Sequence, residues 1–259
     1  MSAILLDQKI IHYEVLGRGR PLLFLHGWVG SWRYWIPAMQ ATSSTFRAYA
    51  VDMWGFGDSA KEMQKYDIEQ QVVLVHDFIN QLGIGKIALI GHGLGALVGL
   101  VFTIQNPEMV DRLLLVSCPG IDGAVNDRLR STSQTDLADW LLERIPLTEN
   151  VRADASKTDS HAVQISLNSL KALNLPELFI RLDKSCVFVH GENDPVVENP
   201  DFDIQSELSH AVTFEQSGHF PMLDESSKFN RLVADFLALP SGESPQKLEL
   251  KEEWRRRVR

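Results

Sequence analysis

The stretch Ile90-Gly91-His92-Gly93-Leu94-Gly95-Ala96 decides how the fold is interpreted, and it fits two different motifs. The apolar run at 86–90 predicts a buried strand before it, and Leu94–Gln105 is apolar and long enough for a helix after it. Strand, glycine turn and helix are the setting of a nucleophile elbow, G-x-S-x-G, whose middle residue attacks the substrate. Here the middle residue is Gly93, which has no side chain to attack with.

The same residues also match G-x-G-x-x-A, a dinucleotide-binding fingerprint, through Gly91, Gly93 and Ala96. That fold needs an acidic side chain at the end of the next strand, about 20 residues further on, to hold the ribose hydroxyls. The next predicted strand, 113–117, ends without a carboxylate, and Asp111 precedes it. The turn also follows three or four predicted strands, whereas a dinucleotide-binding fold usually opens with its glycines. Binding of NAD(P) or FAD is therefore the remote alternative.

Composition and charge limit the class of protein. The 259 residues are 44% hydrophobic and 23% charged, which is ordinary for a globular chain of one domain with an insertion. A net charge of −9 argues against nucleic acid or an anionic membrane as a partner. Because no stretch reaches the ~20 apolar residues of a membrane span and residues 1–7 lack a basic signal-peptide start, we expect a cytoplasmic protein. Cys118 and Cys186 lie in apolar runs and are expected to be buried free thiols.

Strand-like and helix-like segments alternate over most of the chain, which predicts an α/β fold with a largely parallel sheet. We expect strands at 10–15, 22–25, 49–52, 86–90, 113–117, 187–189 and 212–215, and helices at 67–82, 94–105 and 226–239. Between 119 and 183 the pattern becomes mostly helical without a strand signal, and such an insertion commonly forms a lid. The predicted organisation is a discontinuous core (1–118 and 184–240), a helical lid (119–183) and a flexible polar tail (241–259).

Two later loops supply an acid and then a histidine, the partners that a nucleophile elbow needs in that order. Asp194 follows one predicted strand in G-E-N-D-P, and His219 follows the next one in S-G-H-F-P. Both residues should therefore lie at the carboxyl edge of a parallel sheet, where ligand crevices form. Upstream, the loop His26-Gly27-Trp28-Val29-Gly30 follows a strand and can direct backbone N–H groups at a developing oxyanion.

With these motifs in order, the chain resembles the α/β-hydrolase superfamily, and especially its lid-bearing esterase and lipase-like branch. The matching motifs are His26-Gly27-x-x-Gly30, Asp52-x-x-Gly55-x-Gly57-x-Ser59, Gly91-x-Gly93-x-Gly95, Gly191-x-x-Asp194 and Gly218-His219-Phe220-Pro221. The resemblance runs from about residue 10 to residue 239. It implies an α/β-hydrolase fold, in which helices flank a mostly parallel eight-stranded sheet and a helical lid follows the sixth strand.

By this resemblance, His219 would be the general base, Asp194 would orient it, and the backbone N–H groups of Trp28 and Leu94 would form the oxyanion hole. The substrate class implied is a small ester, lactone, thioester or similar carbonyl compound in a mainly apolar pocket, with no cofactor and no metal. The candidates for lining that pocket are His26, Gly27, Trp32, Trp54, His92 and Phe220. The alternative for the aromatic residues is that they only pack the lid, and for His26 that it has a structural hydrogen-bonding role.

Gly93 departs from the family pattern, because a backbone cannot replace the hydroxyl that forms an acyl-enzyme. Glycine nevertheless suits the strained elbow, so the fold tolerates it. Three explanations stay open: an engineered inactive serine hydrolase, a natural binding or signalling module without catalysis, or an enzyme in which Asp194 and His219 activate water or abstract a substrate proton. Ser117 is not expected to be a displaced nucleophile, because nothing in the sequence brings it near His219.

Overall fold

One eight-stranded sheet with the order β1-β2-β4-β3-β5-β6-β7-β8 forms the centre of the protein. The computed structural model describes residues 2–198 and 206–250. The strands are β1 (Ser2–Leu6), β2 (Lys9–Gly17), β3 (Arg20–Leu25), β4 (Phe46–Val51), β5 (Ile87–His92), β6 (Val110–Val116), β7 (Ser185–Gly191) and β8 (Ser209–Phe214). The β1–β2 and β2–β4 pairs are antiparallel, and all other neighbours are parallel. The predicted mostly parallel sheet is confirmed, and β1 is a strand that the hydrophobic pattern does not reveal.

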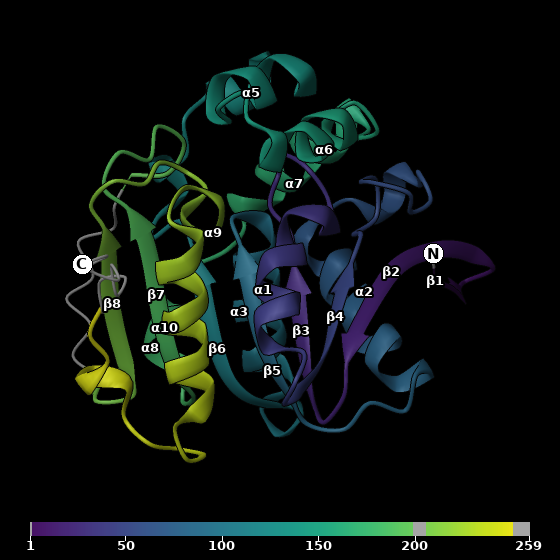
Figure 1. Ribbon diagram of the computed structural model, residues 1–259. Coiled ribbons are helices and arrows are strands. Elements are labelled where there is room, and N and C mark those ends of the chain that lie inside the picture. Colours follow the sequence, from purple (N-terminus) through teal and green to yellow (C-terminus); the bar gives the residue numbers. More distant parts are fainter. Residues whose placement is uncertain (1, 199–205, 251–259) are drawn as a thin grey trace.

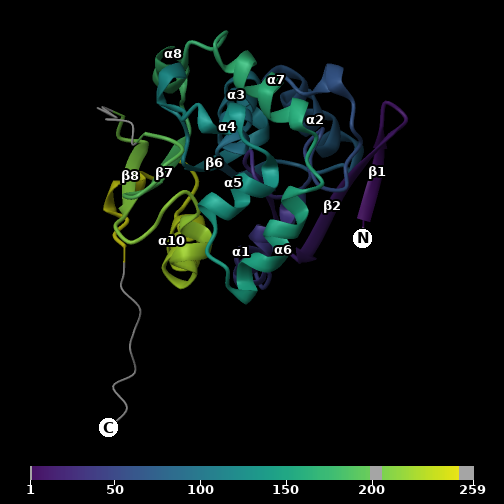
Figure 2. The ribbon, with the colours of Figure 1, turned by 90° about the horizontal axis from the view of Figure 1, so that it is seen from above.

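Helices cover both faces of this sheet (Figures 1 and 2). On one face α1 (Ile36–Thr42) packs against α10 (Ser226–Ala238), and on the other α2 (Ile68–Gln81) packs against α3 (Leu94–Gln105). Shorter elements are η1 (Trp32–Trp35), η2 (Met63–Lys65), η3 (Pro107–Met109), η4 (Asp122–Ala124), α9 (Pro221–Asp224) and η5 (Pro245–Lys247). Strands β5 and β7 are buried along their whole length, as expected for parallel strands covered on both faces.

The local sequence explains where α2 begins and ends. The Asp67 side chain accepts a hydrogen bond from the Gln70 N–H and caps the first turn. Gly83 then adopts a φ of +61°, a conformation that suits glycine and stops the helix before β5. Between these ends the helix buries one apolar stripe against the sheet and α3, made of Val72, Val75, Phe78 and Ile79. The predicted helix at 67–82 is therefore present.

A helical insertion follows β6, the sixth strand, as predicted. It contains α4 (Arg128–Ser131), α5 (Gln134–Leu141), α6 (Pro146–Ala155), α7 (Ser160–Leu170) and α8 (Leu175–Arg181). Figure 1 shows α5, α6 and α7 above the carboxyl ends of the central strands. The sequence predicts a mostly helical insertion without placing its helices, and α6 is the one with the weakest apolar pattern. Its helical pattern is hidden because α6 buries polar side chains, Thr148 and Asp154, beside Val151 and Ala155.

The residues after α10 pack against the end of the sheet. Pro245 is buried, and Leu248 and Leu250 contact the hydrophobic core. The Leu248 carbonyl accepts a hydrogen bond from His210 Nε2 on β8. Residues 251–259 of the predicted flexible tail lie outside the described part of the chain. Within the described residues no helix is long and apolar enough to cross a membrane, and both cysteines are buried and free, as predicted.

Candidate active site

The turn between β5 and α3 has the shape of an elbow, with Gly93 at its apex. Gly93 has a φ of +51° and a ψ of −110°, and its N–H donates to the Val116 carbonyl at 2.9 Å. The flanking glycines permit close packing: a Cβ on Gly91 would collide with the Gly95 carbonyl, and a Cβ on Gly95 would lie 2.5 Å from the Leu25 carbonyl oxygen. The three glycines of the motif are thus explained by elbow geometry, without a dinucleotide.

Asp194 and His219 meet at the same edge of the sheet, beyond β7 and β8. His219 Nδ1 lies 2.9 and 3.0 Å from the two carboxylate oxygens of Asp194, and both side chains are almost completely buried. The backbone N–H groups of Val196 and Val197 donate to Asp194 Oδ1 at 2.8 and 3.2 Å. Because the carboxylate only accepts, Nδ1 carries the proton and Nε2 is left to act on a ligand.

The surroundings of Asp194 keep it ionised. Burial alone would raise its pKa, but the charge and hydrogen bond of His219 and the Val196 N–H outweigh burial and hold the pKa well below its usual range. Ser117 adds a further hydrogen bond that lowers this pKa. A carboxylate that stays charged can orient His219 and stabilise its protonated form, which is what a general base requires.

The oxyanion hole that the sequence analysis expects would use the backbone N–H groups of Leu94, which follows Gly93, and Trp28, whose ring lies beside Gly93. Leu94 is the first residue of α3, and Trp28 follows β3 in the glycine-rich loop. Within residues 2–198 and 206–250, neither N–H donates to a protein acceptor. Buried N–H groups without partners are uncommon in folded proteins, so these two are available to a ligand.

The indole of Trp28 lies directly over Gly93. A Cβ built on Gly93 would be 3.2 Å from Trp28 Cε3, and Trp28 is fully buried. The indole Nε1–H donates to Ser166 Oγ of α7 at 3.1 Å, and Ser166 in turn donates to the Ala162 carbonyl. Trp28 therefore joins the elbow to the helical insertion, and any side chain at residue 93 requires a small shift of the indole.

Two of the candidate histidines are fully buried and hydrogen-bonded. His26 Nδ1 donates to the Gly27 carbonyl at 2.8 Å, and its Nε2 accepts from the Met53 N–H at 3.0 Å. His92 lies between Tyr34 and the backbone of His219. Burial lowers the pKa of His26, and it holds the pKa of His92 well below the usual range.

The three other aromatic pocket candidates have different neighbours. Phe220 is fully buried against the rings of Tyr34, His92 and His219. Trp54 is held to α2, because its backbone N–H and carbonyl both bond the amide of Gln71. Trp32 contacts His12 and Arg33 in a separate polar network.

Three site residues were not predicted from the sequence: Tyr34, Ser166 and, as a partner of Asp194, Ser117. Tyr34 and Ser166 carry no local signal, since one lies in an aromatic run and the other in the insertion. Ser117 has a visible signal, its place at a strand end. Its Oγ lies 3.4 Å from the His219 carbonyl oxygen, and its φ is +46°, which is rare for a residue with a side chain. This contact brings Ser117 near His219, which the sequence did not suggest.

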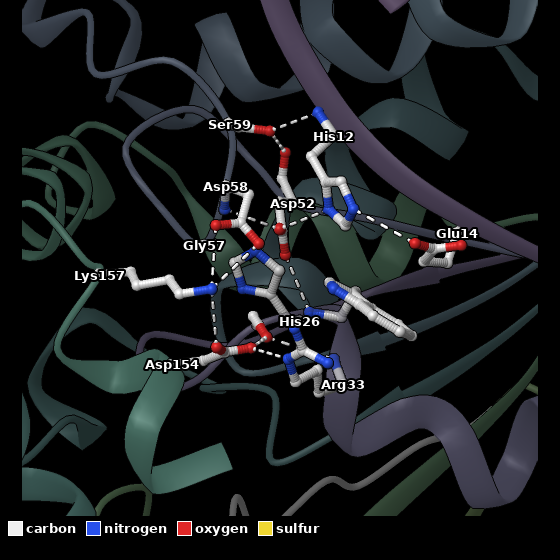
Figure 3. A network of polar contacts seen from close by, with 12 residues as sticks. His12, Glu14, His26, Arg33, Asp52, Gly57, Asp58, Ser59, Asp154 and Lys157 are labelled. Atoms are coloured by element: carbon white, nitrogen blue, oxygen red, sulfur yellow. Dashed lines mark hydrogen bonds and ion pairs between the residues drawn. The ribbon is translucent and has the colours of Figure 1, made fainter. Parts of the chain in front are cut away.

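Beside this site lies the polar network of Figure 3, which connects β2, the loop after β4 and the insertion. His12 Nδ1 bonds Asp52 at 2.9 Å, and Lys157 of the insertion pairs with both Asp58 and Asp154. Donor atoms of His12, Asp52 and Asp58 lie within 4.8 Å of one another, close enough to hold a cation. Lys157 already neutralises Asp58 and His12 already pairs with Asp52, so these groups form ion pairs rather than an open ligand set.

A cavity of about 220 Å³ lies at the opposite, amino-terminal edge of the sheet, beside Arg20, Asp111 and Arg112. Arg112 donates to the Phe236 and Leu239 carbonyls at the end of α10. The positive charge here caps a helix, and the cavity is remote from Gly93.

The comparisons with known proteins point to one fold. A family model described as alpha/beta hydrolase fold matches residues 20–192. A soluble epoxide hydrolase from Corynebacterium sp. (strain C12) is 36% identical over 112 residues, which is 43% of this chain and 39% of that protein. An esterase (EaEST) from Exiguobacterium antarcticum has a TM-score of 0.78 and 21% identity, covering 91% of this chain and 98% of that one.

A serine-to-glycine mutant of the N-acyl homoserine lactonase AidH, complexed with N-hexanoyl homoserine lactone, is similarly close in structure. Its TM-score is 0.78 and its identity 20%, covering 91% of this chain and 96% of that one. At such identities the structural likeness speaks for the fold alone. The family match covers most of the chain, and the elbow, the helical insertion and the sheet order agree with it. The chain therefore belongs to the α/β-hydrolase fold family.

Proposed function

We propose that this protein binds small ester- or lactone-type carbonyl compounds at the elbow, and that Gly93 removes the acyl-enzyme route. The carbonyl oxygen of the ligand would accept hydrogen bonds from the N–H groups of Trp28 and Leu94. The observation that carries the proposal is a buried, hydrogen-bonded Asp194–His219 pair beside an elbow residue that has no side chain: the His219 ring lies 4.5 Å from the ring of His92, the residue before Gly93.

The chemistry of the site supports a neutral, apolar ligand. Trp28 and Phe220 are fully buried aromatic residues at the elbow, and the helical insertion covers it. A structural relative with a serine-to-glycine substitution is known in complex with an N-acyl homoserine lactone, which fits the idea that a glycine form can hold such a compound. A lid over a dry site also strengthens hydrogen bonds to a carbonyl oxygen.

A second candidate is proton transfer or activation of water by His219 without a covalent intermediate. The intact Asp194–His219 pair favours it, because a site that only binds has no chemical need for a buried, charged carboxylate. The contact between the Trp28 indole and Gly93 counts against it, since water at the nucleophile position would need that space.

The test restores the missing hydroxyl with Gly93→Ser and uses Gly93→Ala as the matched control. Both variants add a Cβ at a positive φ and displace Trp28 equally, so only the hydroxyl differs. Loss of a triad nucleophile costs roughly 10⁶-fold in rate, so Gly93→Ser should hydrolyse short aryl esters orders of magnitude faster than Gly93→Ala. The assay is release of the aryl alcohol, with folding of both variants checked by circular dichroism.

Two further measurements separate the candidates. If the chain binds without acyl chemistry, the unaltered protein should gain thermal stability with an N-acyl homoserine lactone while leaving the lactone intact. If His219 performs the chemistry alone, the unaltered protein turns the compound over and His219→Ala abolishes that activity. A folded Gly93→Ser variant that gains nothing over Gly93→Ala would contradict the proposal, as would a thermal shift with NAD(P) or FAD but none with the lactone.

A further inference from the structure

A continuous chain of hydrogen bonds runs from the loop after β3, which contains Gly27, to the loop after β8, which contains His219. The Gly27 N–H bonds Tyr34 Oη at 2.5 Å, Tyr34 Oη bonds His92 Nδ1 at 2.9 Å, and His92 Nε2 bonds the His219 carbonyl at 2.9 Å. We infer that Tyr34 and His92 are positioning residues, which fix the oxyanion-hole loop relative to the backbone of the general base. This inference rests on the proposed function of the site.

Elementary chemistry fixes the direction of every bond in this chain. The His219 carbonyl can only accept, so His92 Nε2 carries the proton and donates it. His92 Nδ1 is then the unprotonated nitrogen and accepts from the Tyr34 hydroxyl. Tyr34 Oη uses a lone pair to accept from the Gly27 N–H, which can only donate. His92 must therefore be the neutral tautomer with its proton on Nε2.

The burial of Tyr34 and His92 supports the neutral tautomer of His92. Tyr34 and His92 are essentially inaccessible, at 1% and 0% exposed. Burial and the neighbouring His219 hold the pKa of His92 well below its usual range, although Asp194 opposes them. Burial also raises the pKa of Tyr34 well above its usual range, so its hydroxyl keeps its proton. A proton on His92 Nδ1 would face the Tyr34 hydroxyl proton and break the chain.

This row of hydrogen bonds joins the elements that hold the candidate site. Gly27 precedes Trp28, Tyr34 lies in η1, His92 ends β5 one residue before Gly93, and His219 follows β8.

Packing leaves this connection little freedom. A Cβ on Gly27 would approach His92 Nδ1 to 2.8 Å, so the loop and the imidazole are already in close contact. Phe220 packs edge-on against the Tyr34 ring at 5.5 Å between centroids. The His219 carbonyl oxygen also lies 3.4 Å from Ser117 Oγ. A shift in any one member must therefore move the oxyanion-hole donor relative to the base.

Tyr34→Phe removes the central hydroxyl while keeping the ring, and Tyr66→Phe is the matched control. Tyr66 is equally buried, and its hydroxyl donates one hydrogen bond, to Asp159 Oδ2 at 2.8 Å, where the Tyr34 hydroxyl makes two. That bond connects the core to the insertion and does not contact the elbow. A difference in effect between Tyr34→Phe and Tyr66→Phe therefore comes from breaking the hydrogen bonds between Gly27 and His219. It does not reflect the general cost of losing a buried hydroxyl.

Two readouts are independent of catalysis. Nitrogen-15 NMR of labelled histidine should show His92 as the neutral tautomer protonated on Nε2, between pH 5 and pH 8. Hydrogen exchange of the Gly27 amide should become severalfold faster in Tyr34→Phe and stay unchanged in Tyr66→Phe. In the Gly93→Ser background, Tyr34→Phe should lower kcat by up to about tenfold with little change in KM, since misalignment affects the transition state more than binding.

A His92 that is protonated on Nδ1, or a Gly27 amide that exchanges equally in both variants, overturns the inference. An equal kcat in both variants, where Gly93→Ser is active, overturns it too. If Gly93→Ser hydrolyses nothing, the proposed function fails, and the tautomer and the amide exchange still decide the inference by themselves.

Discussion

His12 and Asp52 form a buried ion pair whose two pKa values move in opposite directions. Burial lowers the pKa of His12, but the hydrogen bond and charge of Asp52, with Asp58 and Glu14, outweigh it and raise the pKa. Burial raises the pKa of Asp52, and the His12 hydrogen bond and other neighbours lower it overall. The histidine is therefore more easily protonated, and the aspartate more easily ionised, in the folded protein than in the unfolded chain.

This pair predicts a definite dependence of stability on pH. A raised folded pKa for His12 means that its contribution is complete below about pH 6.5, the unfolded value, and is lost as the pH rises through the folded pKa. The Asp52 contribution is present above about pH 3.9 and is lost as the pH falls through its lowered folded pKa. We expect the free energy of unfolding to fall from pH 6.5 to pH 9, and His12→Phe to flatten that fall.

Urea unfolding at half-unit pH steps measures the slope of the free energy of unfolding against pH. His76→Phe, which replaces a half-exposed histidine of α2, is the control for the loss of one imidazole. A His12→Phe slope equal to that of the parent would mean that folding does not raise the pKa of His12.

The elements differ in how well their sequences reveal them. Helix α2 shows an apolar stripe, an aspartate cap and a glycine stop, so its limits follow from the residues alone. Helix α6 shows no such stripe, because it is held largely by polar contacts with η1 and the loop before it. Asp154 of α6 is 3% exposed and accepts hydrogen bonds from Ser31 Oγ and Arg33 Nε, both at 2.6 Å. Contacts between residues so far apart in the chain leave no local pattern.

We expect Asp154→Asn to loosen the insertion without unfolding the sheet. The change removes the charge that Arg33 and Lys157 both face and leaves two cations near each other. Solvent around Arg33 screens part of the repulsion between these two cations. The free energy of local opening of α6 should therefore fall by about 1–3 kcal/mol.

Hydrogen exchange followed by mass spectrometry tests this at the level of single elements. Peptides of α6 should exchange faster in Asp154→Asn, while peptides of β5 and β6 keep the parent rates. Asp77→Asn, in a half-exposed pair on α2, serves as the control. Faster exchange throughout the sheet would mean that Asp154 stabilises the whole fold and not only the insertion.

In the whole molecule, the part of the site that the sequence predicts is the part set by topology. Parallel strands bring their carboxyl ends to one edge, so Gly93, Asp194 and His219 can be placed together from their positions after strands. Tyr34 and Ser166 reach the same place through side-chain packing between distant segments, which no spacing in the sequence encodes. Trp32 shows the reverse case, since its position in the loop suggests the pocket while its ring packs on His12.

The residues at 241–250 bear on the stability of the whole sheet, because they cover its β7–β8 end. Ser185 Oγ donates to the Glu243 carbonyl, and Ser244 Oγ donates to the Glu207 carbonyl. Together with the buried Pro245 and the Leu248–His210 contact, these bonds fix the segment on the last two strands. An edge strand without such cover exposes backbone donors and acceptors and promotes association between chains.

We therefore expect a chain ending at residue 240 to be less stable than one ending at residue 250. The shorter chain should unfold at a lower temperature and associate at high concentration, as measured by scanning calorimetry and light scattering. His210→Ala in the longer chain removes one of these bonds and should lower the melting temperature by a smaller amount. Equal melting temperatures for the two chain lengths would show that β7 and β8 hold the edge of the sheet without help from residues 241–250.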